Sequence, residues 1–260
     1  MSTGYHYPKK DFFLFLPAKI QISQKKTKYF PSNLLAELEY LRTFLYLCRQ
    51  KWKIMNKITN IAFDLGGVVL ALSLEGAIRA FERIGLKDAR QRLDAFQQKG
   101  IFAELESGQI SPEQFRVELS RMTGRELTLQ NCYEAWHGYV DHVPQRNLEK
   151  LLWLRNKGYK VCLLSNTNPF MMEWANKDFD GQGHPIGYFF DRMYLSYECG
   201  VMKPSPKIFQ MMLEGQQALA EETLFVDDSP KNCEAAALLG IKTLCPQNNE
   251  DWTGRLSFLE

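Results

Sequence analysis

Six residues in four short stretches have side chains suited to phosphoryl transfer. They are Asp64, Ser165, Asn166, Lys203, Asp227 and Asp228. An aspartate can act as a nucleophile, and three carboxylates that converge need a cation because they repel one another. Carboxylate and phosphate oxygens are ligands that suit Mg²⁺. Hydroxyl, amide and ammonium donors suit phosphate oxygens, so these residue types predict a magnesium-dependent site for a phosphorylated small molecule.

Taken singly, each stretch has a simpler structural explanation. Asp64 precedes Leu-Gly-Gly and could begin a turn, and Lys203 precedes a proline and could be a solvated charge. The stretches 165–169 and 228–230 each end in a proline and could be helix starts with their caps. The chemistry therefore depends on a fold that brings the four stretches together.

The segments that carry these residues have the pattern of buried parallel strands. Apolar runs without polar alternation occupy residues 58–64, 159–165, 192–196, 223–227 and 241–244. Helical patterns lie between them at 145–157, 169–177, 205–213 and 230–239. This alternation predicts an α/β fold with a doubly wound parallel sheet, a Rossmann-like core. Ligands bind at the carboxyl ends of such strands, where the polar residues would gather.

The first connection is too long for a simple crossover. Asp64 and Ser165 are 101 residues apart, whereas a strand–helix–strand unit needs only a few dozen. Helix-like stretches fill the interval at 74–84, 89–98, 112–122 and 129–136. We therefore predict a small helical cap at 72–143, inserted into a core formed by 55–71 and 144–260. The cap should lie over the carboxyl ends of the strands.

The N-terminal leader differs from the rest of the chain in charge. Residues 1–60 carry 11 Lys and Arg against 3 Asp and Glu, a net charge of +8, whereas residues 61–260 carry 21 against 27, a net charge of −6. A leucine stripe over 34–48 could form a helix that packs on the domain, or a basic amphipathic helix that binds a membrane surface or a partner. Alternatively, translation begins at Met55 and residues 1–54 are not native. We expect residues 1–54 to be dispensable for catalysis, because every motif lies beyond Met55.

The whole-chain composition excludes several classes of protein. With 45% hydrophobic residues, 13% aromatic residues and a net charge of +2, the chain is neither disordered nor suited to an obligate nucleic-acid partner. No stretch approaches the roughly 18 apolar residues of a membrane span. The six cysteines form no Cys-x-x-Cys pair, which is typical of a reducing compartment. We expect a cytoplasmic protein, and its oligomeric state is left open.

Four motifs, in order along the chain, resemble those of the haloacid dehalogenase-like hydrolase superfamily. They are FDLGGV at 63–68, LLSNTN at 163–168, GVMKP at 200–204 and FVDDSPKN at 225–232. The resemblance covers about residues 57–245. Within the superfamily, the Asp-Leu-Gly motif and Glu106-Ser107-Gly108 of the insert are similar to bacterial sugar-phosphate phosphatases of the α-glucose-1-phosphate phosphatase type.

The resemblance implies a catalytic role for four of the matching residues. Asp64 would attack phosphorus, giving an aspartyl-phosphate that water then hydrolyses. Ser165 and Asn166 would bind the transferring phosphoryl group. Lys203 would neutralise that group and orient Asp64.

The resemblance also implies the ligands of Mg²⁺. The cation would be bound by Asp64, the backbone carbonyl of Gly66 and Asp228. Asp227 would assist directly or through water. Asn232 would support the loop that carries the acidic pair rather than touch the substrate.

One position departs from the pattern of most phosphatases in the superfamily. They carry a second aspartate two residues after the nucleophile, as the general acid for the leaving group and the base for water, and here that position is Gly66. We therefore expect a substrate whose leaving oxygen needs little protonation, such as an anomeric or aryl phosphate, or an acid from elsewhere. Glu104, Glu106 and His137 of the insert are the candidates for that acid.

Two other functions stay open at this point. The dehalogenases of the superfamily also lack the second aspartate, but they work without Mg²⁺ and without the acidic pair that Asp227 and Asp228 form here. A phosphate-binding regulatory protein that has lost turnover would keep the same motifs. We expect an Mg²⁺-dependent phosphatase of a small phosphorylated metabolite, with a sugar phosphate favoured by analogy.

Overall fold

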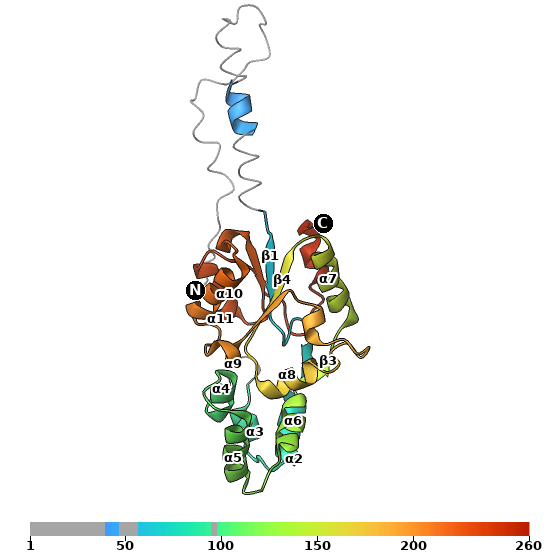
Figure 1. The fold of residues 1–260 in the computed structure, drawn as a ribbon, viewed down its shortest axis with the longest axis vertical. Helices are drawn as coiled ribbons and strands as arrows, with labels where there is room; N and C mark the ends of the chain where they lie inside the picture. Colours follow the sequence, from blue (N-terminus) through green and yellow to red (C-terminus); the bar gives the residue numbers. More distant parts are fainter. Residues whose placement is uncertain (1–39, 47–56, 95–97, 260) are drawn as a thin grey trace, which may run out of the picture. The chain divides into compact units, whose positions relative to one another are not determined.

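The fold is that of a computed structural model, which describes residues 40–46, 57–94 and 98–259 (Figure 1). The chain divides into two compact units, Met1–Trp52 and Lys53–Glu260. Of the first unit, the structure describes residues 40–46, which are helical and exposed. The rest of the predicted leader, and Met55, lie outside the described residues. Within the described ranges, no helix is both long enough and apolar enough to cross a membrane.

Five parallel strands form the central sheet of the second unit, in the order β5-β4-β1-β6-β7. Their bounds are β1 Asn60–Phe63, β4 Lys160–Ser165, β5 Arg192–Leu195, β6 Thr223–Val226 and β7 Lys242–Leu244. The register places Asn60 of the central strand β1 beside Lys160 of β4 and Thr223 of β6. Each strand falls inside one of the five predicted segments, which confirms the predicted parallel sheet.

Helices cover both faces of the sheet, which explains why its strands are apolar without alternation. On one face, Ile61 and Phe63 share a buried core with Leu151 of α7 and Trp252. On the other, Ala62 packs in a core with residues of α10 and α11. Figure 1 shows α7 on one side of β1 and β4, and α10 with α11 on the other. The helices of the core are α7 Gln145–Asn156, α8 Pro169–Ala175, α9 Ser196–Cys199, α10 Pro206–Gln216 and α11 Pro230–Leu238.

Three core helices begin with a proline in their first turn, where its missing N–H costs nothing. These are α8, α10 and α11, and each follows a stretch that carries a predicted site residue. In α8 the cap is Asn168, whose Oδ1 accepts hydrogen bonds from the backbone N–H groups of Phe170 and Met171. Local cap chemistry therefore fixes where the chain turns away from the ends of the strands.

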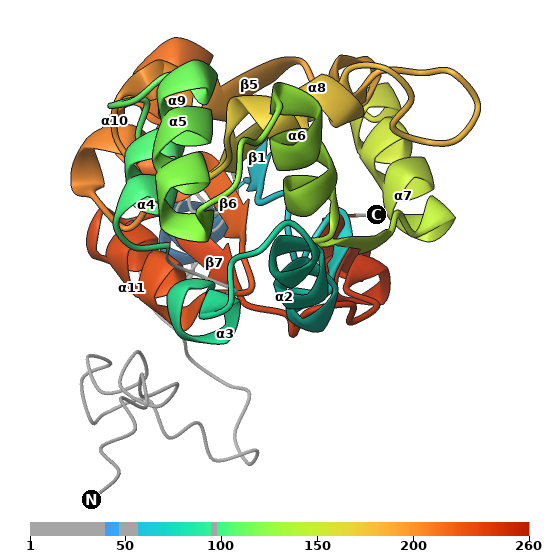
Figure 2. The same cartoon turned by 90° about the horizontal axis from the view of Figure 1, so that it is seen from below.

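Between β1 and β4 the chain forms helices beyond the carboxyl ends of the strands (Figure 2). Two short strands, β2 Ala71–Leu72 and β3 Val140–His142, pair antiparallel where the chain leaves and returns. The inserted helices have their own buried core around Phe81, Phe102 and Trp136. They are α2 Leu74–Arg83, α3 Ala89–Arg92, α4 Ile101–Glu106, α5 Pro112–Thr123 and α6 Leu129–His137. The predicted helical insertion is confirmed, and its boundaries at 72 and 143 stay a prediction.

The insert differs from the prediction at two helices. The single helix predicted over 89–98 is wrong in length, because α3 ends at Arg92. A further helix, α4, was not predicted and begins after Gly100, whose φ of 56° suits glycine. With 6 residues, α4 has fewer than two turns, so the helical spacing of Ile101, Phe102 and Leu105 is too short to identify a helix from sequence.

Candidate active site

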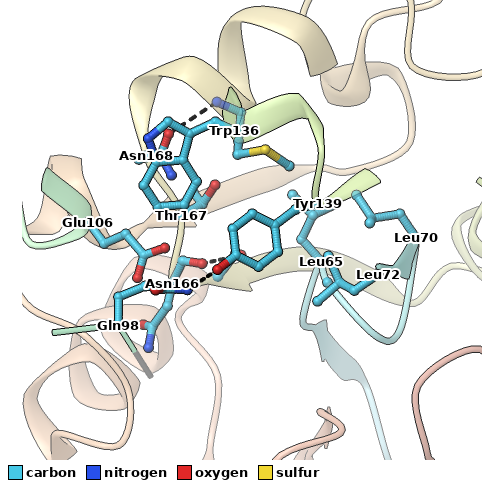
Figure 3. A pocket seen from close by; sticks show the side chains of 13 residues that line it. Leu65, Leu70, Leu72, Gln98, Glu106, Trp136, Tyr139, Asn166, Thr167 and Asn168 are labelled. Carbon is cyan, nitrogen blue, oxygen red and sulfur yellow. Dashed lines mark hydrogen bonds between the residues drawn. The ribbon is translucent and has the colours of Figure 1, made fainter. Parts of the chain in front are cut away.

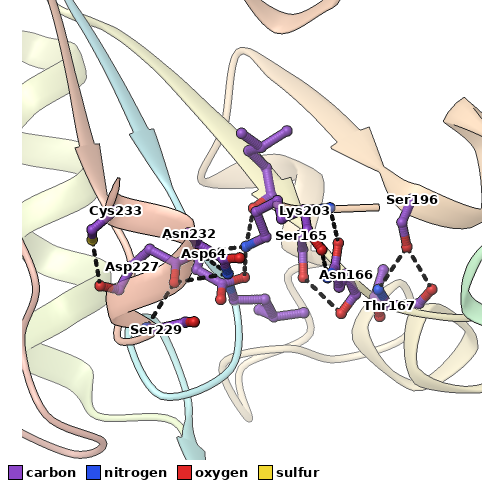
Figure 4. A network of polar contacts seen from close by, with 12 residues as sticks. Asp64, Ser165, Asn166, Thr167, Ser196, Lys203, Asp227, Ser229, Asn232 and Cys233 are labelled. Atoms are coloured by element: carbon purple, nitrogen blue, oxygen red, sulfur yellow. Dashed lines mark hydrogen bonds and ion pairs between the residues drawn. The ribbon is translucent and has the colours of Figure 1, made fainter. Parts of the chain in front are cut away.

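The ends of two neighbouring strands bring three aspartates together. Figure 4 shows two of them, Asp64 and Asp227. Asp64 follows β1, while Asp227 and Asp228 follow β6. The backbone N–H of Asp64 donates to the Val226 carbonyl at 2.8 Å, which holds the two strand ends side by side. One carboxylate oxygen from each aspartate lies within 4.8 Å of the other two. The predicted convergence of these residues is therefore present in the structure.

Lys203 is the buried cation of this cluster, with 2% of its surface exposed. Its Nζ donates to Asp64 Oδ1 at 2.8 Å, to Asp227 Oδ2 at 2.7 Å and to the Leu164 carbonyl at 2.8 Å. An ammonium has three hydrogens, so each has a protein acceptor. Burial alone would lower the pKa of Lys203, but the Asp227 and Asp64 carboxylates outweigh it and raise that pKa. Lys203 thus stays charged and holds both carboxylates in place.

Asn166 holds the loop that carries Lys203. Its Oδ1 accepts from the Lys203 backbone N–H at 2.8 Å, and its Nδ2 donates to the Lys203 carbonyl at 2.9 Å. One amide hydrogen and the backbone N–H of Asn166 are left over from this pair. Ser165 is buried, with Oγ 3.4 Å from the Asn166 carbonyl. Binding of the phosphoryl group by Ser165 and Asn166 stays a prediction.

Asp227 is the most enclosed of the three aspartates, with no exposed surface. Its Oδ1 accepts from the Ser229 N–H at 2.8 Å, its Oδ2 accepts from Lys203, and Asn232 Nδ2 lies 3.1 Å from both oxygens. Both oxygens therefore have protein partners, which suits an indirect role beside a cation. The contact of Asn232 agrees with its predicted role of supporting the acidic loop.

Gly67 allows Asp228 to approach the end of β1. A Cβ atom at Gly67 would lie 2.0 Å from Asp228 Oδ2, and the φ of 77° at this position also favours glycine. Within the described ranges, no side chain donates a hydrogen bond to the Asp228 carboxylate. Asp228 is therefore the aspartate with the most oxygen lone pairs free for a cation.

The acidic cluster carries more negative charge than Lys203 can balance. Burial raises the pKa of Asp64 to about 8, and the charges of Asp227 and Asp228 add to this rise while Lys203 opposes it. Burial likewise raises the pKa of Asp228 to about 7, with a further contribution from Asp227. A divalent cation would remove this excess, and the oxygen donors match the preference of Mg²⁺. The residues present therefore fit the predicted metal.

A second cavity adjoins the acidic site on the side of the cap (Figure 3). Both cavities are lined by Gly66, Leu72 and Asn166, so they lie next to each other. The core contributes the loops that follow β1 and β4. The cap contributes Gln98, Glu106, Trp136 and Tyr139. A bound phosphate ester would place its phosphoryl group at the aspartates and its leaving group in this second cavity.

Two residues with buried donors line the cap-side cavity. Trp136 Nε1 and Asn168 Nδ2 make no hydrogen bond of good geometry within the described part of the chain, although the two residues are 2% and 1% exposed. Buried polar groups nearly always have a partner. The Asn168 amide also acts on the nearby Glu106 carboxylate, so Trp136 Nε1 is the donor of this pair without a protein partner. Sequence analysis predicts only a cap role for Asn168 and no role for Trp136.

Among the three candidate acids, Glu106 is the one that lines the cavity. Burial raises its pKa to about 8; the negative charge of Asp64 adds to this, while Lys203 and Asn168 partly oppose it. His137 instead stacks on Tyr133 and meets the edge of Trp174. Glu104, on the same helix as Glu106, is half-buried and does not line either cavity.

Leu72 occupies the space beside Gly66. A Cβ atom at Gly66 would lie 2.7 Å from Leu72 Cδ1, and the backbone of Gly66 is outside the left-handed region. The obstacle to a side chain at Gly66 is therefore this leucine methyl group rather than backbone strain. The position of the missing second aspartate is filled by an apolar group.

Comparison with known proteins supplies the family. Residues 58–240 match the family described as haloacid dehalogenase-like hydrolase. The chain belongs to this family. A D-ribitol-5-phosphate phosphatase from Bacteroides thetaiotaomicron is 44% identical to it over 203 residues, which are 78% of this chain and 98% of that protein. The chain is therefore a phosphatase of the haloacid dehalogenase-like family, acting on a phosphorylated small molecule.

Two solved structures resemble this phosphatase in sequence and in fold. A predicted hydrolase of the family from Porphyromonas gingivalis is 42% identical, with a TM-score of 0.74, covering 78% of this chain and 97% of its own. A family enzyme from Bacteroides thetaiotaomicron, in complex with magnesium and inorganic phosphate, is 36% identical, with a TM-score of 0.70, covering 76% and 98%. Together with the acidic cluster, this confirms the predicted magnesium cofactor.

The comparisons confirm one part of the predicted resemblance and correct another. The superfamily, the phosphatase activity and the magnesium cofactor are as predicted. The narrower likeness to α-glucose-1-phosphate phosphatases is not supported, because the relative at 44% identity is a D-ribitol-5-phosphate phosphatase.

Proposed function

We propose that this phosphatase hydrolyses the phosphate monoester of a small sugar alcohol, such as D-ribitol 5-phosphate. The observation that carries this proposal is the cap-side cavity, which is lined by hydrogen-bonding side chains, among them Trp136, whose Nε1 donor lacks a protein acceptor. An alditol offers several hydroxyl groups to such donors, and its carbon chain can lie along Leu70 and Met171 of the same cavity. The similarity to the D-ribitol-5-phosphate phosphatase supports the same substrate class.

The nucleophile in this proposal is Asp64. Both of its protein contacts, from Lys203 Nζ and from the Leu65 N–H, go to Oδ1, which leaves the lone pairs of Oδ2 free for attack. Attack on phosphorus expels the alcohol and gives an aspartyl-phosphate, which water then hydrolyses. Lys203 keeps Asp64 oriented and contributes positive charge beside the phosphoryl group. Ser165 and Asn166 bind the phosphoryl oxygens.

The acidic cluster holds the cofactor in this proposal. Asp64, the backbone carbonyl of Gly66 and Asp228 are the direct ligands of Mg²⁺, and Asp227 assists from its fixed position. When bound, Mg²⁺ offsets the negative charge of the carboxylates and of the phosphate oxygens. The aspartates, in turn, are held by strand pairing and by Lys203, so they need little rearrangement to bind the cation.

We further propose that the core and the cap have different roles in the reaction. The core, 55–71 with 144–260, supplies the nucleophile and the metal ligands. The cap, 72–143, supplies most of the surface that recognises the leaving group. Residues 1–54 are not needed for catalysis.

The proposal is tested by measuring phosphate release with Mg²⁺ from D-ribitol 5-phosphate, glucose 1-phosphate and glucose 6-phosphate. We expect the highest kcat/KM for the ribitol ester. Asp64→Asn should abolish turnover of every ester, because loss of a nucleophile removes several orders of magnitude of rate. A preference for glucose 1-phosphate would contradict the substrate class. An Asp64→Asn variant with more than about a tenth of the wild-type rate would contradict the nucleophile.

A further inference from the structure

The proposed substrate class creates a chemical requirement that the acidic cluster does not meet. Ribitol 5-phosphate is the ester of a primary alcohol, so its leaving oxygen departs as a strongly basic alkoxide unless it receives a proton. Proton donation to such a group contributes about 10²–10⁴-fold in rate. Position 66, two residues after the nucleophile, is a glycine, and Leu72 fills the space beside it. The proton must come from another element.

Glu106 reaches the cavity where the leaving oxygen would lie. It is the last residue of α4 and is 7% exposed. Figure 3 shows the Glu106 side chain extending toward Thr167 and Asn166, which also line the cavity. Among the described residues that line the cap-side cavity, Glu106 is the sole carboxylic acid.

The surroundings of Glu106 favour its protonated form. The charged or titratable groups that act on it are Asp64, Lys203 and Tyr139. Burial and the Asp64 charge together raise the pKa of Glu106 to about 8, despite Lys203 and the Asn168 amide. A carboxylic acid that keeps its proton near neutral pH is suited to donate it during bond cleavage.

The other polar groups nearby are poorer donors. The Tyr139 hydroxyl donates to the Asp94 carbonyl, and burial raises the pKa of Tyr139. The three hydrogens of Lys203 are held by Asp64, Asp227 and Leu164. Gln98 does not titrate. Among the described side chains that line the cap-side cavity, Glu106 is therefore the one suited to lose a proton near neutral pH.

We propose that Glu106 is the general acid and base of this phosphatase, an assignment that rests on the proposed primary-alcohol substrate. In the first step, an Asp64 oxygen forms a bond to phosphorus and the bond from phosphorus to the ester oxygen breaks. The electron pair stays on the ester oxygen, which takes the proton of Glu106 and leaves as the alcohol. Asp64 is now phosphorylated and Glu106 is a carboxylate.

The second step reverses the role of Glu106. Water enters the position that the alcohol has left, opposite Asp64, and its oxygen attacks phosphorus. The Glu106 carboxylate takes a proton from this water as the bond between phosphorus and Asp64 breaks. This step releases inorganic phosphate and restores free Asp64 and protonated Glu106. One cycle therefore consumes one ester and one water. A single residue can serve both steps because the alcohol and the water occupy the same site.

The test compares Glu106→Gln with the wild type on two esters, D-ribitol 5-phosphate and p-nitrophenyl phosphate. The nitrophenolate leaving group departs without a proton, so the first step on that ester does not need an acid. We expect kcat/KM for the ribitol ester to fall about 10²–10⁴-fold and kcat/KM for the aryl ester to change far less. Glu104→Gln removes a carboxylate from the same helix outside both cavities and should leave both values unchanged.

A pH profile supplies a second readout. In the wild type, kcat/KM for the ribitol ester should fall on the alkaline side as Glu106 loses its proton, and Glu106→Gln should lack this alkaline limb. Equal losses on both esters, or no loss on either, would overturn the role of Glu106 while leaving the substrate class intact. A wild type that cleaves the aryl ester but no primary-alcohol ester would instead overturn both proposals.

Discussion

Lys203 and Asp227 form the fixed part of the site at the scale of single residues. Every hydrogen of the Lys203 ammonium and both oxygens of Asp227 are already bonded within the protein. Asp64, which lies beside Lys203, and Asp228, which lies beside Gly67, both keep oxygen lone pairs that no protein group uses. Ligand binding therefore depends on the small residues that let these two carboxylates approach each other.

Gly67→Ala should weaken Mg²⁺ binding by about 10–100-fold, as expected when a group that positions a metal ligand is disturbed. The added Cβ would lie 2.0 Å from Asp228 Oδ2 and must displace it. Calorimetric titration of the purified protein with Mg²⁺ measures the effect. Gly181→Ala is the matched control, because Gly181 has a similar φ of 73° but no atom within 4 Å of its added Cβ. Equal affinities in the two variants would show that Gly67 does not position Asp228.

The residues of the acidic site were predictable because parallel strands place their carboxyl ends at one edge. Asp64 and Asp227 needed no tertiary detail beyond the pairing of β1 with β6. The use of Asn166 as the support of the Lys203 loop was not predictable, since it depends on two hydrogen bonds across 37 residues. The unpartnered Nε1 donor of Trp136 depends on how the cap packs against the core, which no local pattern encodes.

At the scale of elements, one hydroxyl group joins the cap to the core. Ser196, the first residue of α9, has no exposed surface. Its Oγ lies 2.6 Å from the Glu106 carbonyl and 3.1 Å from the Thr167 carbonyl, and it accepts from the Thr167 N–H at 3.0 Å. The end of α4, the loop after β4 and the start of α9 therefore meet at this side chain. Figure 4 shows Ser196 beside Thr167. The hydrogen bond from Ser196 Oγ to the Glu106 carbonyl therefore holds the backbone of Glu106 in position.

Ser196→Ala should lower kcat/KM for D-ribitol 5-phosphate more than for p-nitrophenyl phosphate, because it loosens the backbone of the proposed acid. The lost bonds should also cost about 1–3 kcal/mol of stability, since buried polar groups lose their partner. Steady-state kinetics and thermal unfolding measure the two effects. Ser111→Ala, which removes an exposed cap from α5, should cost about 0.5–2 kcal/mol without changing the ratio of the two kcat/KM values. The same ratio in both serine variants would exclude a positioning role for Ser196.

The sequence predicted the strands better than the cap helices. The strands are continuous apolar runs because helices cover both faces of the sheet, and this pattern is local. The six residues of α4 carry no such signal, and they stand between Gly100 and Ser107. The sequence therefore does not predict α4, the helix that carries Glu106, although the residue type alone makes Glu106 a candidate acid.

At the scale of the whole molecule, the excess negative charge of the acidic cluster makes the stability of the fold depend on pH. Without metal, the folded protein holds protons on Asp64 and Asp228 up to about pH 8 and about pH 7, whereas the ordinary pKa of these carboxyls is 3.8. Between these values the folded state binds more protons than the unfolded state. Stability of the metal-free protein therefore falls as pH rises through this window. A bound cation reverses this dependence of stability on pH, because it favours the ionised carboxylates.

The stabilisation given by Mg²⁺ should therefore grow as pH rises. We expect the difference in Tm between protein in Mg²⁺ and protein in chelator to be small near about pH 5 and largest above about pH 8, where protons no longer compete for Asp64 and Asp228. With Mg²⁺ at about 100 times its Kd, the gain approaches about 2.7 kcal/mol. Asp228→Asn should lose most of this gain, whereas Asp141→Asn, an exposed aspartate outside the cluster, should keep it. A gain that is the same at every pH would show that these carboxylates are already ionised before the metal binds.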